Sequence, residues 1–162
     1  MSDRGGEHRD RALNDRMLTV CARIPRPLLE RAIVMGSAAI VLRGVHLGRE
    51  PGDIDLFVSP ATFSSWPAEG FSHVVKDGVA RIVVDAEPIE LLAAFPGVAF
   101  DAVEARAAAV DGSHGVRVAA LEDLLTWKRA QKELRADPAD RNKDAADIRA
   151  LEAHLRSSFR IA

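Results

Sequence analysis

Apolar residues are distributed along the chain in two patterns, helix-spaced stripes and short continuous runs. Between residues 10 and 24 they recur at helical spacing, which predicts an amphipathic helix that ends at the prolines that follow. Residues 1–9 are polar and contain glycine, so we expect a disordered segment there. Residues 32–35 form a continuous apolar run, which predicts a short buried strand, and residues 38–43 return to a helix-like pattern.

Further short apolar runs, bounded by turn residues, predict a sheet of several strands. Asp77-Gly78 is a typical two-residue hairpin turn, and it separates two runs rich in valine. A second hairpin is expected around Asp111-Gly112-Ser113. The expected strands cover residues 53–58, 71–75, 79–84, 89–92, 107–110 and 116–118.

Two helix-spaced stripes close the sequence and predict a C-terminal helical pair within residues 120–157. The first helix is expected over about residues 120–134 and the second over 139–157. Residues 30–118 would form the mixed-sheet core against which these helices pack. The whole pattern predicts an α/β (α+β) fold, with one domain over residues 1–162, because this length is typical of a single domain.

Composition limits the function and the compartment. The formal net charge of −2 argues against an extended nonspecific nucleic-acid binder, which would usually be strongly basic. Cys21 is the only cysteine, so no internal disulfide can form, and this fits an intracellular setting. The chain has no long apolar span, and charged residues dominate its first 20 positions, unlike a signal peptide. We therefore expect a soluble, cytoplasmic protein with no membrane partner.

The pair of aspartates in Asp53-Ile54-Asp55 is the most informative motif. In a strand both side chains point to one face, with Cα atoms roughly 7 Å apart, so the two carboxylates can converge on one cation. Like charges on one face repel each other, and a cation would remove that repulsion. The competing interpretation is that both aspartates belong to the solvated face of an edge strand.

The dipeptide Gly36-Ser37 lies between the expected strand at 32–35 and the helix-like stretch at 38–43. Glycine lets the backbone approach a phosphate closely, and Ser37 with the helix N-terminus can donate hydrogen bonds to phosphate oxygens. The alternative is structural, with a tight turn at the glycine and an N-cap at the serine. A strand, a Gly-Ser turn, a helix and an acidic strand together are suited to holding a nucleoside triphosphate and its metals.

Three motifs together resemble the nucleotidyltransferase superfamily that includes DNA polymerase β. They are Gly36-Ser37, Asp53-Ile54-Asp55 and Ile89-Glu90-Leu91, and the likeness is closest to small AbiEii toxin-like proteins, the minimal nucleotidyltransferases. The resemblance covers about residues 30–156, and Lys143-Asp144-Ala145-Ala146-Asp147-Ile148 strengthens it. It implies a nucleotidyltransferase-like mixed sheet with flanking helices.

The resemblance also implies a role for individual residues and a divalent cofactor, Mg²⁺ or Mn²⁺. The third carboxylate stays open, because Asp85 and Glu87 lie on the same stretch as Glu90 and the family position more often carries aspartate. The implied catalytic and metal-binding residues are Asp53, Asp55 and Glu90, and the implied nucleotide-binding residues are Gly36, Ser37, Lys128 and Lys143.

Lys128 allows two interpretations. It continues the apolar stripe of its predicted helix, so its ammonium group must reach water, pair with an acid or contact a ligand. One interpretation is a structural ion pair with Asp144 or Asp147 between the two C-terminal helices. The other places Lys128 or Lys143 on the triphosphate.

The predicted function is a metal-dependent nucleotidyltransferase, which moves a nucleoside monophosphate from an NTP to a hydroxyl-bearing acceptor. The acceptor stays open among RNA or tRNA, protein and small molecules, and the resemblance implies a toxin–antitoxin or defence role with a partner protein. The first alternative is a non-catalytic nucleotide-binding member of the same fold, such as an antitoxin or a regulatory protein. The second is a generic α/β protein whose acidic strand is merely exposed.

Overall fold

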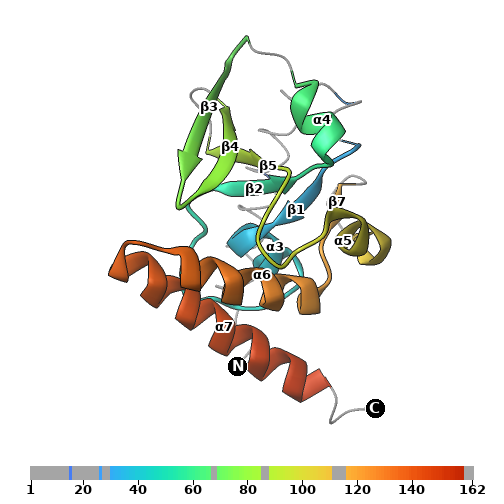
Figure 1. Cartoon of the computed structure of the whole chain (residues 1–162). Helices are drawn as coiled ribbons and strands as arrows, with labels where there is room; N and C mark the ends of the chain where they lie inside the picture. The colour runs from blue at the N-terminus through green and yellow to red at the C-terminus, as the bar shows by residue number, and fades with distance from the viewer. Residues whose placement is uncertain are drawn as a thin grey trace.

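A seven-stranded mixed sheet organises the computed structural model, which describes residues 15, 26, 30–66, 69–84, 88–110 and 116–158 (Figure 1). The expected helix at residues 10–24, apart from Asp15, and the expected disordered segment at 1–9 lie outside the described residues. The strands lie in the order β3-β4-β5-β2-β1-β7-β6. Their bounds are β1 (Ile33–Met35), β2 (Ile54–Phe57), β3 (Phe71–Lys76), β4 (Val79–Val84), β5 (Ile89–Leu92), β6 (Ala108–Ala109) and β7 (Arg117–Val118).

Strand β2, which carries the aspartate motif, lies in the middle of the sheet. It runs antiparallel to β1 and parallel to β5. In this register Asp55 stands opposite Met35 on β1 and opposite Glu90 on β5, and Asp53 immediately precedes the strand. A strand with a neighbour on each side has no free edge, so the interpretation of the two aspartates as part of an edge strand is wrong.

Helices α6 and α7 lie side by side on one side of the sheet, with α3 between α6 and strands β1 and β2 (Figure 1). Trp127 of α6 is fully buried, stacks on Phe95 with 4.1 Å between the ring centroids, and contacts Phe57 of β2 edge-on at 5.4 Å. Phe57 and Asp55 share one face of β2, so this contact holds α6 against the face that carries the aspartate. The helix bounds are α3 (Gly36–Leu42), α4 (Pro60–Ser64), α5 (Phe100–Arg106), α6 (Leu121–Leu134) and α7 (Pro138–Ser158).

Most of the predicted elements are confirmed. The β3–β4 hairpin turns at Asp77-Gly78, and α6 and α7 match the two predicted C-terminal helices to within one residue at each end. Strands β6 and β7 pair as the predicted second hairpin, although residues 111–115 between them lie outside the described part. Helix α5 was not predicted, because only Val103 of its seven residues is buried, which gives no helical stripe.

The core consists mainly of the central strands. All three residues of β1 are fully buried, and so are Leu56 and Phe57 of β2. Asp55 lies among them with only 6% of its surface exposed, so it is a buried carboxylate between apolar strand residues. None of the helices in the described ranges is long and apolar enough to cross a membrane.

Candidate functional site at the centre of the sheet

The contact between Gly36 and Asp55 joins the two motifs singled out in the sequence. Gly36 follows Met35, the partner of Asp55 in the sheet register, and its φ of +68° lies in the left-handed region. A Cβ atom built on Gly36 would overlap Oδ2 of Asp55 and lie 3.1 Å from its Cγ. Glycine is therefore required twice here, for the backbone conformation and for the space that the carboxylate fills.

Burial disfavours the charged form of Asp55. Loss of water, followed by the negative charge of Asp53, raises the pKa of Asp55 to about 7, and the positive charge of Arg81 opposes the shift. Oδ1 of Asp55 is buried and has no hydrogen-bond partner among the described residues. Arg81 lies 3.7 Å from this oxygen, too far for a hydrogen bond. A buried carboxylate oxygen without a hydrogen bond is costly, and a closely bound cation would satisfy it.

Glu90, the expected third metal ligand, forms an ion pair with Arg81 of the neighbouring strand β4. The guanidinium also lies 3.7 Å from Oδ1 of Asp55, and the Arg81 side chain is only 2% exposed. In the described part of the chain, no group of three or more His, Cys, Asp or Glu residues is placed to hold a metal ion. The rival carboxylates Asp85 and Glu87 lie outside that part.

Two carboxylates nevertheless suit a divalent cation. Asp55 of β2 and Asp53, which immediately precedes that strand, both line the same pocket. Carboxylate oxygens are the ligands that Mg²⁺ and Mn²⁺ prefer, and Oδ1 of Asp55 accepts no hydrogen bond among the described residues, having only the 3.7 Å ion pair with Arg81. Asp53 and Asp55 thus fit the implied cofactor, while Glu90 is engaged by an arginine.

A buried network around Asp147 ties α3 to α7. Ser37 Oγ donates a hydrogen bond of 2.8 Å to Asp147, and Arg49 donates to the same carboxylate at 2.7 and 2.8 Å. The N-cap of α3 is Met35, which makes no side-chain capping bond, so the interpretation of Ser37 as an N-cap is wrong. Its hydroxyl also accepts a hydrogen bond of 2.9 Å from Arg49.

Lys128 completes this network from α6. Its ammonium group lies 2.8 Å from Asp144 and 3.0 Å from Asp147, and the side chain is 4% exposed. The structural ion pair considered from the sequence is confirmed, with both aspartates as partners. Arg135, in turn, binds Asp144 at 3.2 Å and Asp77 in the hairpin turn at 3.0 Å, which connects the β3–β4 hairpin to the helices.

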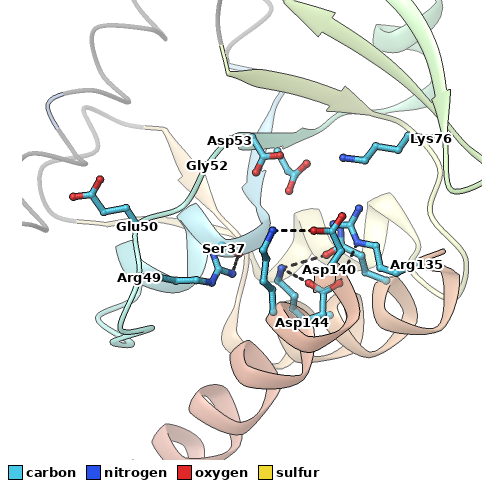
Figure 2. Close-up of a pocket in the computed structure, with 13 residues that line it drawn as sticks. Ser37, Arg49, Glu50, Gly52, Asp53, Lys76, Arg135, Asp140 and Asp144 are labelled. Carbon is cyan, nitrogen blue, oxygen red and sulfur yellow. Dashed lines mark hydrogen bonds and ion pairs between the residues drawn. The ribbon is translucent and has the colours of Figure 1, made fainter. Parts of the chain in front are cut away.

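A pocket of about 350 Å³ opens beside these groups (Figure 2). Lys76 extends from β3 into it toward Asp53, and among the described residues no acid lies within ion-pair distance of this lysine. Lys143 also lines the pocket, but it pairs with Asp140 at 3.0 Å and its side chain is 58% exposed. The lining residues are Ser37, Arg49, Glu50, Gly52, Asp53, Asp55, Lys76, Lys128, Gln131, Arg135, Asp140, Lys143 and Asp144.

Sequence reasoning missed three basic residues of the site, Arg81, Lys76 and Arg135. Arg81 carried a usable signal, because it alternates with Val79 and Val83 on the inward face of β4. A charge at such a position must have a buried partner. Lys76 and Arg135 carried no such signal, since their positions depend on how the hairpin meets the helices.

Comparison of the chain with protein-family models, with curated proteins and with solved structures found no match in any of the three. The resemblance to nucleotidyltransferases therefore depends on the sequence motifs alone.

The first prediction concerns the fit between Gly36 and Asp55. Gly36→Ala should lower the free energy of unfolding by about 2–5 kcal/mol, because a left-handed alanine is strained and its methyl group overlaps the carboxylate. Gly48→Ala is the matched control, since Gly48 has nearly the same φ, +69°, but open space around it. We expect it to lose only about 1–2 kcal/mol. Equal losses in urea unfolding would contradict the close fit.

The second prediction concerns the two pocket lysines on the C-terminal helices. Lys128→Met should cost about 1–3 kcal/mol of folding stability, because it removes the cation that Asp144 and Asp147 share and leaves each buried carboxylate with one arginine only. Lys143→Met should change stability by less than about 0.5 kcal/mol, since its ion pair is exposed. Chemical denaturation of both variants checks this, and a small loss for Lys128→Met would show that the network is not structural.

The third prediction follows from the raised pKa of Asp55. Between its ordinary value of 3.8 and about 7 the folded protein binds more protons at this carboxyl than the unfolded chain does. The stability that Asp55 contributes is therefore present near pH 4 and is lost as the pH rises through 7. Asn resembles the protonated acid, so Asp55→Asn should gain stability relative to the wild type from pH 5 to pH 8.

Unfolding by urea at the two pH values measures this difference. The exposed Asp101→Asn variant serves as the control, and we expect its difference from the wild type to stay constant. If the wild type instead gained stability relative to Asp55→Asn from pH 5 to pH 8, the raised pKa of Asp55 would be contradicted.

Proposed function

We propose that this protein is a metal-dependent nucleotidyltransferase that takes an NTP in the pocket beside Asp53 and Asp55. The observation that carries the proposal is the buried Asp55 carboxylate, which lies against Gly36, has an oxygen that accepts no hydrogen bond among the described residues, and lines a pocket together with a second carboxylate, Asp53. Burying Asp55 beside the half-buried Asp53 is unfavourable without a ligand, and a cation bound with a triphosphate would compensate the two negative charges. The contact between Gly36 and Asp55 also joins the Gly-Ser motif to the aspartate motif, two of the three motifs on which the resemblance depends.

In the proposed complex the carboxylates bind the metal ion and the basic side chains bind the phosphates. Asp53 and Asp55 would hold Mg²⁺ or Mn²⁺, which would neutralise phosphate charge and polarise the reacting phosphate. Lys76 is the pocket lysine best placed to bind phosphate oxygens, because no acid among the described residues lies within ion-pair distance of it and it points toward Asp53 (Figure 2). Lys143 is exposed and can join it after leaving the half-buried Asp140.

The remaining polar groups of the pocket act on the shape of the site. Ser37 is hydrogen-bonded to Asp147, and Lys128 forms ion pairs with Asp144 and Asp147. These two residues therefore fix the positions of the helices that line the pocket, and the nucleotide contacts are assigned to other side chains. In the proposed reaction the acceptor hydroxyl oxygen bonds to the α-phosphorus, the bond to pyrophosphate breaks, and the hydroxyl proton passes to a base. RNA or tRNA, protein and small molecules all supply such a hydroxyl.

A second candidate function is nucleotide binding without catalysis, as in an antitoxin or a regulatory partner. The ion pair between Arg81 and Glu90 favours it, because that pair takes the third carboxylate away from the reacting groups. Both candidates share the same pocket and the same ligand, and they differ only in turnover.

The fourth prediction separates these candidates. Protein incubated with α-³²P-labelled NTPs and Mg²⁺ should transfer label to one of three acceptor pools: RNA, protein or metabolites. Asp53→Asn should reduce transfer by more than about 100-fold, since even groups that only orient metal ligands are worth 10–100-fold. Asp101→Asn, away from the pocket, should transfer at the wild-type rate.

Calorimetric titration with each NTP and Mg²⁺ completes the test. Wild-type protein that binds an NTP but transfers label to none of the pools would support the non-catalytic candidate. Protein that binds none of the four NTPs would refute both.

A further inference from the structure

Arg81 is the most deeply buried arginine around the site, and the sheet itself sets its position. Val83 pairs with Glu90 between β4 and β5, and Glu90 pairs with Asp55 between β5 and β2. Arg81 lies two residues before Val83, so it shares the face of both acids. Only 2% of its side chain is exposed, and its Nε has no partner among the described residues.

The guanidinium compensates two carboxylates that face each other. Asp55 and Glu90 are directly opposite across two parallel strands, where like charges destabilise a sheet. Arg81 is ion-paired with Glu90 and lies 3.7 Å from Oδ1 of Asp55, so one fixed positive charge lies between them. Placing a cation there is the task that a second metal ion performs in a two-metal site.

Asp53 stands apart from this arrangement. It precedes β2 and lines the open pocket, whereas Arg81 and Glu90 are absent from the pocket lining. The side of the aspartate motif that lines the pocket is therefore available to a cation that arrives with a ligand. The side that faces β4 already has a cation, the guanidinium of Arg81. Asp55 belongs to both sides, because it lies near Arg81 and also lines the pocket.

We propose that Arg81 is a built-in cation that takes the place of one metal ion, so that the site binds a single divalent cation with its nucleotide. This inference rests on the proposed nucleotide site and defines its metal content. Asp53 and Asp55 hold the one cation together with the triphosphate. Glu90 is the anchor of Arg81, and Arg81 is a positioning residue for Asp55.

Counting bound Mn²⁺ by electron paramagnetic resonance tests the proposal without a need for turnover. The full-length protein is saturated with each of the four α,β-methylene NTP analogues in turn, and Mn²⁺ is counted per bound nucleotide. We expect one Mn²⁺ for the wild type and two for Arg81→Met, because the freed Asp55 and Glu90 then form a second site. Arg81→Met with Glu90→Gln should return to one.

Two controls isolate the charge at this position. Arg81→Lys keeps a cation and should bind one Mn²⁺, and Arg106→Met removes an arginine that pairs with Asp123 outside the pocket and should also bind one. Circular dichroism establishes which variants are folded. The wild-type count decides the proposal even if Arg81→Met does not fold.

Three outcomes would overturn the inference. Two Mn²⁺ ions per nucleotide in the wild type would overturn the inference and leave the proposed nucleotide site intact. One Mn²⁺ in folded Arg81→Met would also overturn it. A wild-type protein that binds neither the analogues nor Mn²⁺ would refute the proposed function, and the inference with it.

Discussion

The approach of the Asp55 carboxylate to the backbone of Gly36 is the constraint on which the site depends. A sheet interior normally excludes a carboxylate, and this one is admitted because the residue beside it has no side chain. The position of α3 follows from the same contact, since Gly36 begins that helix with a left-handed φ. From α3 the polar network passes through Ser37 to α7.

Charge compensation then organises the rest of the molecule around that carboxylate. Arg81 lies on the sheet side of Asp55, and Lys128 approaches from α6, where Asp144 and Asp147 bind it. Buried pairs of this kind contribute little net stability compared with apolar packing, but breaking one is costly. Their effect here is to fix where the helices meet the sheet, with the stacked rings of Trp127 and Phe95 supplying the apolar contact.

The fold was largely predictable because its elements carry local signals. The Asp77-Gly78 turn defines its hairpin, and the C-terminal stripes define α6 and α7. Of the site, the sequence predicted that Asp53 and Asp55 point to the same side, where both line the pocket, and it predicted the pairing of Lys128 with the aspartates of α7 as one of two interpretations. These inferences required only strand alternation and helix periodicity.

The other site contacts depend on which strands are neighbours. The pairing of Arg81 with Glu90 requires β4 to lie beside β5, and the bond between Arg135 and Asp77 requires the hairpin turn to reach the end of α6. Ser37 was expected to face a phosphate, but its hydroxyl binds Asp147, 110 residues away in the chain. No local pattern reports contacts over such separations. The metal and the reaction remain proposals.

The cations of the pocket fall into two classes that ionic strength should treat differently. Lys128 and Arg81 are buried against their acids, where mobile ions cannot enter, so added salt barely weakens their ion pairs. Lys76 and Lys143 are exposed to solvent, and their attraction for an anionic ligand is screened over about 8 Å at physiological salt. Salt therefore weakens the capture of a ligand while the scaffold that receives it keeps its shape.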